Sequence, residues 1–308
     1  MSATLPQRIV NAMTVDVEDY FHVSGFAGLV RPEDWPRLES RVEANTHKLL
    51  EIFAAHKVSA TFFVLGWVAE RNPTLVQAIH RAGHEVACHG YSHALVYQLT
   101  PEEFRKDVRR AKTLLEDVAG TPVDGYRAPS FSIVKSSLWA LDILAEEGFH
   151  YDSSIFPIRH NRYGIPDAHR FPHQWNGNGL AEFPISTFRV WGVNLPVGGG
   201  GYFRLLPYAV TRWSIQRLNN GEQRPAVVYI HPWELDPAQP RMPGPLWGRF
   251  RHYVNLHTTE AKLHRLLDGF SFKGLRWFLD SLKGQGGTVF ASAKTEGNTC
   301  LSVDPDPK

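Results

Sequence analysis

The chain has 308 residues, of which 43% are apolar and 21% are charged, a composition typical of a globular protein with a substantial core. A formal net charge of +2 and the lack of a Lys/Arg block exclude electrostatic binding of nucleic acid as an expected function. No run of about 18 apolar residues is present, so we expect no integral membrane segment.

The cysteines and the amino terminus predict the cellular compartment. Cys88 and Cys300 lie far apart in the sequence, which argues against a disulfide framework and favours a reducing environment. Residues 1–10 lack the apolar core of a signal peptide. We therefore expect a cytoplasmic protein.

Segments typical of strands and helices alternate along the first two-thirds of the chain. Asn72-Pro73 supplies a cap and a first-turn proline for one helix, and Thr100 with Glu103 forms a capping-box pattern for the next. Because strands and helices alternate, the sequence predicts a parallel sheet, either closed as a barrel or doubly wound. The expected strands are 11–17, 59–65, 149–153 and 226–230, and the expected helices are 37–56, 73–83, 101–118 and 137–148.

Polar side chains occur where the predicted strands end. Asp16, Asp152 and His231 lie at or near such ends, and His89 follows the apolar-leaning run 85–88. Arg127 follows the segment 123–126 in a comparable place. Functional groups lie at the carboxyl ends of parallel strands in both architectures, so we expect these residues to share one site.

Two later regions depart from the alternation. Residues 158–201 are rich in Pro, Gly, His and aromatic side chains, which favours a loop insertion over the site. We therefore expect a barrel domain over residues 1–235 that includes this insertion. A helical carboxyl-terminal extension over 236–308 should pack on the barrel, with a polar tail from about residue 295.

His89 and His93 are candidate metal ligands, because three intervening residues let two neutral imidazoles face one ion such as Zn²⁺. Asp16, Glu18 and Asp19 place three carboxylates in four positions after an apolar strand, more than a solvated loop or a helix cap needs. One carboxylate can bind a metal while another serves as general base. Two histidines and one carboxylate leave positions open for water and substrate, as in catalytic metal sites.

Arg127 and His231 are the other candidate catalytic residues. The forked guanidinium of Arg127 can hold the Asp16 carboxylate ionised and oriented. His231 lies between an apolar strand and Pro232, where it can act as a general acid that protonates a leaving amine. A surface arginine and a structural core histidine are the alternatives.

Five segments, read in order, resemble the motifs of the NodB-homology polysaccharide deacetylases, carbohydrate esterase family 4. The continuation from His231 to Pro237, with the helical extension, also resembles a narrower subfamily, the deacetylases of bacterial exopolysaccharide loci associated with the exosortase/PEP-CTERM system. The five segments are Thr14-Val15-Asp16-Val17-Glu18-Asp19, His89-Gly90-Tyr91-Ser92-His93, Arg127-Ala128-Pro129-Ser130-Phe131, Tyr151-Asp152-Ser153-Ser154 and Tyr229-Ile230-His231-Pro232.

The resemblance implies a distorted (β/α)7 barrel and a divalent metal ion, usually Zn²⁺. It implies that Asp16 is the base, that Arg127 orients it and that His231 is the acid. Asp152 falls at the fourth motif and is expected to be a further catalytic residue. We expect four residues in or beside the motifs to bind substrate: Tyr91, Pro129, Phe131 and Trp233.

The resemblance gives His89 and His93 as metal ligands and leaves the third open between Glu18 and Asp19. Common family members have two adjacent aspartates, whereas Val17 follows Asp16 here. A related branch separates its two acids by one residue, which favours Glu18. Aspartate is the usual ligand type, which favours Asp19, and we rank Asp19 slightly ahead.

The implied reaction is metal-assisted hydrolysis of N-acetyl groups on amino sugars of a bacterial exopolysaccharide or its precursor. The expected partner is therefore an N-acetylated glycan, and a lipid-linked precursor would place the protein near the inner membrane. Two alternatives stay open: an amidohydrolase of the same barrel that acts on a small cyclic amide, and a non-catalytic carbohydrate-binding relative. The sequence does not specify the oligomeric state.

Overall fold

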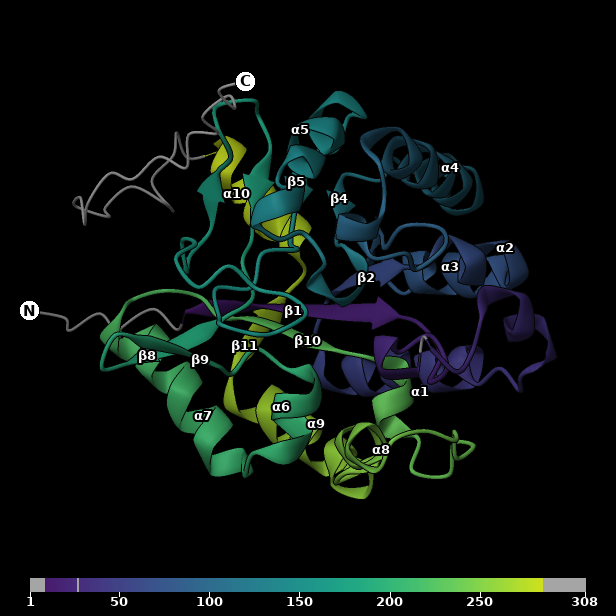
Figure 1. Ribbon diagram of the computed structural model, residues 1–308. Coiled ribbons are helices and arrows are strands. Elements are labelled where there is room, and N and C mark those ends of the chain that lie inside the picture. Colours follow the sequence, from purple (N-terminus) through teal and green to yellow (C-terminus); the bar gives the residue numbers. More distant parts are fainter. Residues whose placement is uncertain (1–8, 27, 285–308) are drawn as a thin grey trace, which may run out of the picture.

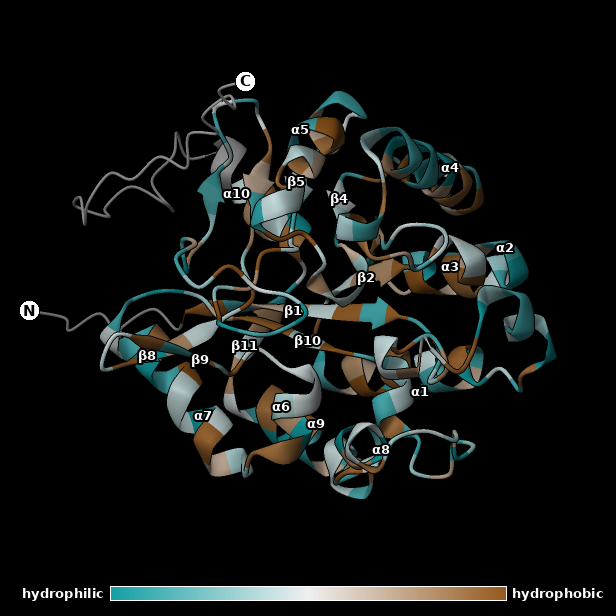
Figure 2. Ribbon diagram, viewed as in Figure 1, coloured by the Kyte–Doolittle hydropathy of each residue, from teal (hydrophilic) through white to brown (hydrophobic). Residues whose placement is uncertain are grey.

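Strand β1 (Val10–Val17) lies at the centre of the computed structural model, which describes residues 9–26 and 28–284 (Figure 1). It pairs in parallel with three strands: β2 (Thr61–Val64), β10 (Val227–Ile230) and β11 (Ser271–Lys273). All residues from 11 to 17 are buried. A strand covered on both faces favours an apolar sequence, and β1 is mostly apolar before Asp16, with Asn11 and Thr14 as its other polar residues (Figure 2).

Nine strands form one sheet in the order β10-β1-β2-β3-β4-β5-β7-β6, with β11 beside β1. Neighbouring strands are parallel except for β6 and β7. The sheet curls as a half-barrel, so the structure confirms the expected α/β class and is consistent with a distorted barrel. The remaining strands of this sheet are β3 (Glu85–Cys88), β4 (Gly125–Tyr126), β5 (Tyr151–Asp152), β6 (His173–Gln174) and β7 (Ala181–Glu182).

The expected helices follow the strands. In the capping box, Glu103 N donates to Thr100 Oγ1 at 3.3 Å and Thr100 N donates to Glu103 Oε2 at 2.8 Å. This confirms the predicted start of the helix that begins at Pro101. Figure 1 shows α2–α5 on one side of β1. The helices of the first half of the chain are α1 (Val42–His56), α2 (Gly66–Arg71), α3 (Pro73–Arg81), α4 (Pro101–Ala119) and α5 (Trp139–Glu146).

The later part of the chain also contributes to the sheet. The insertion at 158–201 supplies β6 and β7, together with a separate hairpin of β8 (Thr187–Val190) and β9 (Val193–Pro196). The extension supplies β11, and its tail from about residue 295 lies outside the described residues. Figure 1 shows α6–α9 on the side of β1 opposite α2–α5. The later helices are α6 (Gly200–Leu205), α7 (Tyr208–Gln216), α8 (Leu246–Tyr253), α9 (Leu256–Gly269) and α10 (Leu275–Gly284).

Two expectations from composition concern these described residues. None of their helices is long and apolar enough to cross a membrane. Cys88 is buried as a free thiol, and Cys300 lies outside the described residues.

Candidate active site

The carboxyl edge of the sheet brings the predicted residues together. Asp16 lies one residue before the end of β1, and His231 directly follows the neighbouring β10. Strands β3 and β4 are also neighbours, so His89 and Arg127 follow adjacent strand ends. Parallel pairing therefore gathers four side chains that are up to 215 residues apart in sequence.

Asp16 and Arg127 form a buried ion pair. Arg127 Nη1 lies 2.7 Å from Asp16 Oδ1 and also donates to Thr14 Oγ1 at 2.8 Å. The other donors of the guanidinium bind Ser153, with Nε donating to its backbone oxygen and Nη2 to its hydroxyl. The Arg127 side chain has no exposed surface. Removing either charge would leave the other buried without compensation, so the pair fixes the Asp16 carboxylate.

Glu18, His89 and His93 form the group in the described part of the chain that could hold a metal ion. One ligand atom of each residue lies within 4.8 Å of the other two, and all three residues are buried. Glu18 Oε2 makes no hydrogen bond of good geometry, although His93 Nε2 lies 2.5 Å away. Two imidazole nitrogens and one carboxylate oxygen are a typical donor set of catalytic zinc sites, so these residues fit a divalent ion.

Hydrogen bonding and burial prepare these groups for a cation. His89 Nδ1 donates to the backbone oxygen of Arg127 at 2.8 Å, which leaves Nε2 as the ligand atom. Burial lowers the pKa of His89 to about 4, so its imidazole is neutral. For Glu18, burial raises the pKa, but the neighbouring His93, His231 and His89 together hold it well below the usual range. The carboxylate is therefore ionised.

Asp19 does not join this group, and the order in which the sequence ranked the two carboxylates is reversed. Its Oδ2 accepts hydrogen bonds from Ser40 Oγ at 2.8 Å and from the backbone N–H groups of Arg41 and Val42 at 2.8 and 3.1 Å. Its Oδ1 accepts from Tyr20 N at 3.0 Å. Asp19 therefore satisfies the free N–H groups at the start of α1 from another loop, as a helix cap does.

His231 faces the first-motif carboxylates. Its Nε2 lies 3.4 Å from Glu18 Oε1 and 3.9 Å from Asp16 Oδ2, the oxygen that Arg127 does not bind. Its Nδ1 lies 2.7 Å from Glu234 Oε1. Burial lowers the pKa of His231, but the hydrogen bond to Glu234 and the charge of Glu18 outweigh burial and raise it to about 9. The imidazole therefore carries the proton that a general acid needs.

Asp152 is the last residue of β5, the strand beside β4. It accepts hydrogen bonds from Ser154 N at 3.0 Å and Ser154 Oγ at 2.6 Å, and it pairs in register with Glu182 of β7. Burial raises the pKa of both carboxyls. Among the described residues, no hydrogen bond or ion pair of Asp152 reaches Asp16, His231 or the metal-site group. The structure thus places Asp152 beside a second buried carboxyl group, and the catalytic role expected for it stays a prediction.

Three of the four expected substrate residues lie near His231 or Arg127. Trp233 stacks on His231, with ring centroids 5.1 Å apart. Pro129 and Phe131 follow Arg127, and Phe131 packs edge-on against Tyr229 at 4.9 Å. Ser130 and Phe131 both have positive φ, 53° and 54°, a strained backbone that is common at functional sites.

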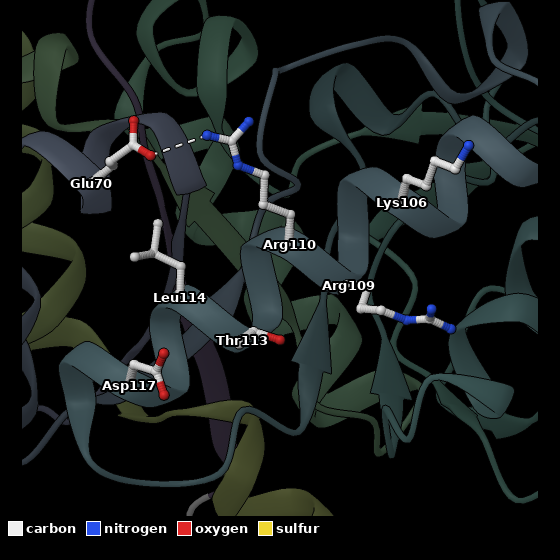
Figure 3. A pocket seen from close by; sticks show the side chains of 7 residues that line it. All are labelled: Glu70, Lys106, Arg109, Arg110, Thr113, Leu114 and Asp117. Carbon is white, nitrogen blue, oxygen red and sulfur yellow. Dashed lines mark hydrogen bonds and ion pairs between the residues drawn. The ribbon is translucent and has the colours of Figure 1, made fainter.

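Tyr91 is directed elsewhere. Its hydroxyl donates to Glu70 Oε2 at 2.8 Å, and the Arg110 guanidinium lies 3.4 Å above its ring. Glu70 and Arg110 line a shallow depression between α2 and α4 (Figure 3). The structure thus gives Tyr91 contacts with this outer surface and does not bring it together with the other predicted residues.

Sequence reasoning missed three buried residues around the site. Glu234 binds His231, and Arg204 Nε lies 3.7 Å from the other oxygen of Glu234. The only sequence signal for Glu234 was its position three residues after His231 in a proline turn. His22 packs its ring against those of Trp35 and Trp67, and lies 6.1 Å from the ring of His93.

Two consecutive segments of the chain match different protein families. Residues 33–149 match the family described as Polysaccharide deacetylase, and residues 153–280 match a domain of unknown function, DUF3473. The chain is 31% identical over 157 residues to a peptidoglycan deacetylase of Helicobacter pylori, and the match covers 49% of this chain and 51% of that protein. It is 33% identical over 111 residues to a peptidoglycan-N-acetylglucosamine deacetylase of Bacillus cereus, a match that covers 36% of this chain and 38% of that protein. The chain thus spans about half or less of these relatives.

A solved structure supports the fold over a longer range. The crystal structure of a Mycobacterium smegmatis protein assigned as a polysaccharide deacetylase superposes with a TM-score of 0.58 at 23% identity. The superposition covers 92% of this chain and 94% of that one. The family model and the relatives thus show similarity to polysaccharide deacetylases over part of this chain, and the solved structure shows the same fold.

Proposed function

We propose that this chain, whose residues 33–149 match the polysaccharide deacetylases, is a metal-dependent hydrolase that removes N-acetyl groups from amino sugars. One observation carries the proposal: Glu18, His89 and His93 converge at the strand ends that also carry the buried Asp16–Arg127 pair. A metal-free hydrolase or a purely structural role would not need two imidazoles and two carboxylates brought together in this way.

Glu18, His89 and His93 would hold the metal ion, most suitably Zn²⁺. When bound, the ion supplies Lewis-acid polarisation of the acetyl carbonyl and of the attacking water. The three side chains occupy only part of a zinc coordination sphere, so positions remain for those two groups.

Asp16 would act as the general base. Arg127 binds Oδ1, so Oδ2 is the oxygen available to take a proton from the attacking water. The backbone N–H of Ser130, in the strained turn after Arg127, is a candidate donor to the oxyanion that forms on the acetyl carbon.

His231 would act as the general acid. Its Nε2 faces the same space as Asp16 Oδ2 and can protonate the departing sugar nitrogen, which releases acetate. Glu234 acts through His231 as a positioning residue: it accepts a hydrogen bond from Nδ1 and so fixes the orientation of the ring.

The substrate is proposed to be a bacterial exopolysaccharide or its precursor. The resemblance of the segment from His231 to Pro237 and of the extension to deacetylases of exosortase-associated loci supports this choice. The relatives named above act on peptidoglycan, which shares the N-acetylated amino sugar.

Acetate release from N-acetylglucosamine oligomers tests the proposal. The purified chain should release acetate, lose this activity with a chelator and regain it when Zn²⁺ is added. Glycan binding without acetate release would favour the non-catalytic alternative. Activity on a small cyclic amide without activity on the oligomers would favour the other amidohydrolase.

A further inference from the structure

Helix α8 presents large apolar side chains to solvent. Leu246 is 82% exposed and Trp247 is 71% exposed, while Phe250 and Leu29 are each about half exposed. Leu29 adjoins the helix, because a Cβ atom added to Gly244, two residues before α8, would lie 2.9 Å from Leu29 Cδ1. We call these four residues, Leu29, Leu246, Trp247 and Phe250, the α8 surface.

The buried side of the same helix reaches the candidate active site. His252 of α8 stacks on Trp233 with ring centroids 4.3 Å apart, and Trp233 in turn stacks on His231. A ligand on the α8 surface would therefore be separated from the proposed acid by one helix and one aromatic ring.

The segment that carries α8 has charged side chains of one sign. Residues 237–259 contain no aspartate or glutamate. Glu33 and Asp34, which follow Leu29 in sequence, are matched in number by Arg31 and Arg37, which lie within 4.0 Å of them. The three arginines of the segment 237–259 are all exposed: Arg241, Arg249 and Arg251.

This combination favours a lipid bilayer over a glycan as the ligand of the α8 surface. Exposed Trp and Leu beside Arg, without carboxylates, are typical of helices that lie at the interface of an anionic bilayer. A sugar site would pair its aromatic rings with polar groups placed for the hydroxyls. Leu246, the most exposed residue of the α8 surface, offers no such group.

We propose that the α8 surface docks this protein on a bilayer that contains anionic lipids. Leu246 and Trp247 enter the boundary between headgroups and acyl chains, and Arg249 binds the anionic headgroups. The docking does not depend on the proposed deacetylase reaction. It would hold the catalytic edge beside glycans carried at a membrane.

Vesicle sedimentation of the full chain tests the docking. The wild type should bind vesicles of phosphatidylcholine mixed with phosphatidylglycerol, bind phosphatidylcholine alone far less, and detach as salt is raised. The double variant Leu246→Ser/Trp247→Ser should lower the partition coefficient about tenfold or more. Arg249→Gln should lower it about fivefold on the anionic vesicles.

Trp191→Ser is the matched control. Trp191 is 99% exposed in the turn between β8 and β9, which Figure 1 shows well apart from α8. This variant should bind vesicles as the wild type does, and circular dichroism should show all variants folded.

Three results would overturn the docking. The wild type does not bind anionic vesicles, the double variant binds them as well as the wild type, or the control variant Trp191→Ser loses binding while the double variant keeps it. Weaker binding of soluble N-acetylglucosamine oligomers by the double variant, with vesicle binding unchanged, would identify a glycan as the ligand of the α8 surface and also overturn the docking. Acetate release from those oligomers is measured separately, so the two proposals fail independently.

Discussion

The two nitrogens of His231 contact carboxylates on opposite edges of the ring: Nδ1 lies 2.7 Å from Glu234 Oε1, and Nε2 lies 3.4 Å from Glu18 Oε1. Glu234 is fully buried, and its other oxygen faces the guanidinium of Arg204. A ring held in this way cannot turn its Nε2 away from the site without breaking the bond to Glu234.

Replacing Glu234 by Gln should therefore impair amide hydrolysis. Gln has the same size but no charge to hold the Nδ1 proton, so kcat on N-acetylglucosamine oligomers should fall by at least about tenfold, up to the roughly 10²–10⁴-fold contribution of a general acid. KM should change little, since acid catalysis acts in the transition state.

Hydrolysis of 4-nitrophenyl acetate is the internal comparison. Its phenolate leaves without being protonated, so Glu234→Gln should retain this activity while losing deacetylation. An equal loss on both substrates would mean that the substitution only disturbs the fold or the metal site.

Glu18 and Asp19 are adjacent carboxylates whose substitutions should have opposite signatures. Glu18→Gln should weaken zinc binding by more than the roughly 10–100-fold typical of an outer-shell partner. Asp19→Asn should keep its zinc but lower the free energy of unfolding by about 1–3 kcal/mol. A neutral amide then replaces the carboxylate that accepts hydrogen bonds from the N–H groups at the start of α1.

Metal analysis and thermal unfolding of the two variants separate these roles. Zinc lost from Asp19→Asn and retained in Glu18→Gln would restore the ranking suggested by the sequence.

Asp16→Asn should abolish most of the deacetylation and leave a folded protein. The amide oxygen can still accept from Arg127, but it cannot take a proton from water, so kcat should fall by about 10²–10⁴-fold. Asp117→Asn, the same change in the depression of Figure 3, is the control and should keep wild-type kcat. Near-normal acetate release by Asp16→Asn would contradict the assignment of Asp16 as the general base.

Acid should destabilise the chain through buried neutral histidines. Burial lowers the pKa of His84 to about 4, and its Nδ1 accepts a hydrogen bond from Ala60 N at 3.1 Å. The unfolded chain takes up this proton near pH 6.5. Between these values the unfolded state binds more protons, so the free energy of unfolding falls as the pH decreases from about 6.5 to about 4.

Urea unfolding at several pH values measures this slope. His84→Gln should make it shallower by up to about one proton, whereas His80→Gln, on the exposed side of α3, should leave it unchanged. A slope that His84→Gln does not alter would show that His84 does not contribute.

Local patterns predicted most of the first half of the fold. The capping box at Thr100, the proline at 73 and the apolar runs of β1 and β10 depend on neighbouring residues only, so the sequence shows them directly. Strands β7 and β11 could not be found in this way. β7 is two residues long, and β11 forms by pairing with β1 across about 260 residues of chain.

The site was predicted as far as strand ends determine it. Asp16, His89, Arg127 and His231 follow from that rule, but Glu18 and Asp19 lie beyond β1, where strand alternation no longer decides which side chain points inward. The N–H groups at the start of α1 bind the Asp19 carboxylate and so keep it out of the candidate metal site. No local pattern contains that information.

With Glu18 as a ligand of the proposed metal ion, the hydrogen bonds from the start of α1 to Asp19 would couple metal occupancy to the opening of that helix. Glu18 and Asp19 are consecutive, so a loop that moves to release one ligand must also release the N–H groups of Arg41 and Val42. By linkage, an ion that binds only the closed loop should slow hydrogen exchange at those two amides. The first turn of α1 would then report on the metal without touching it.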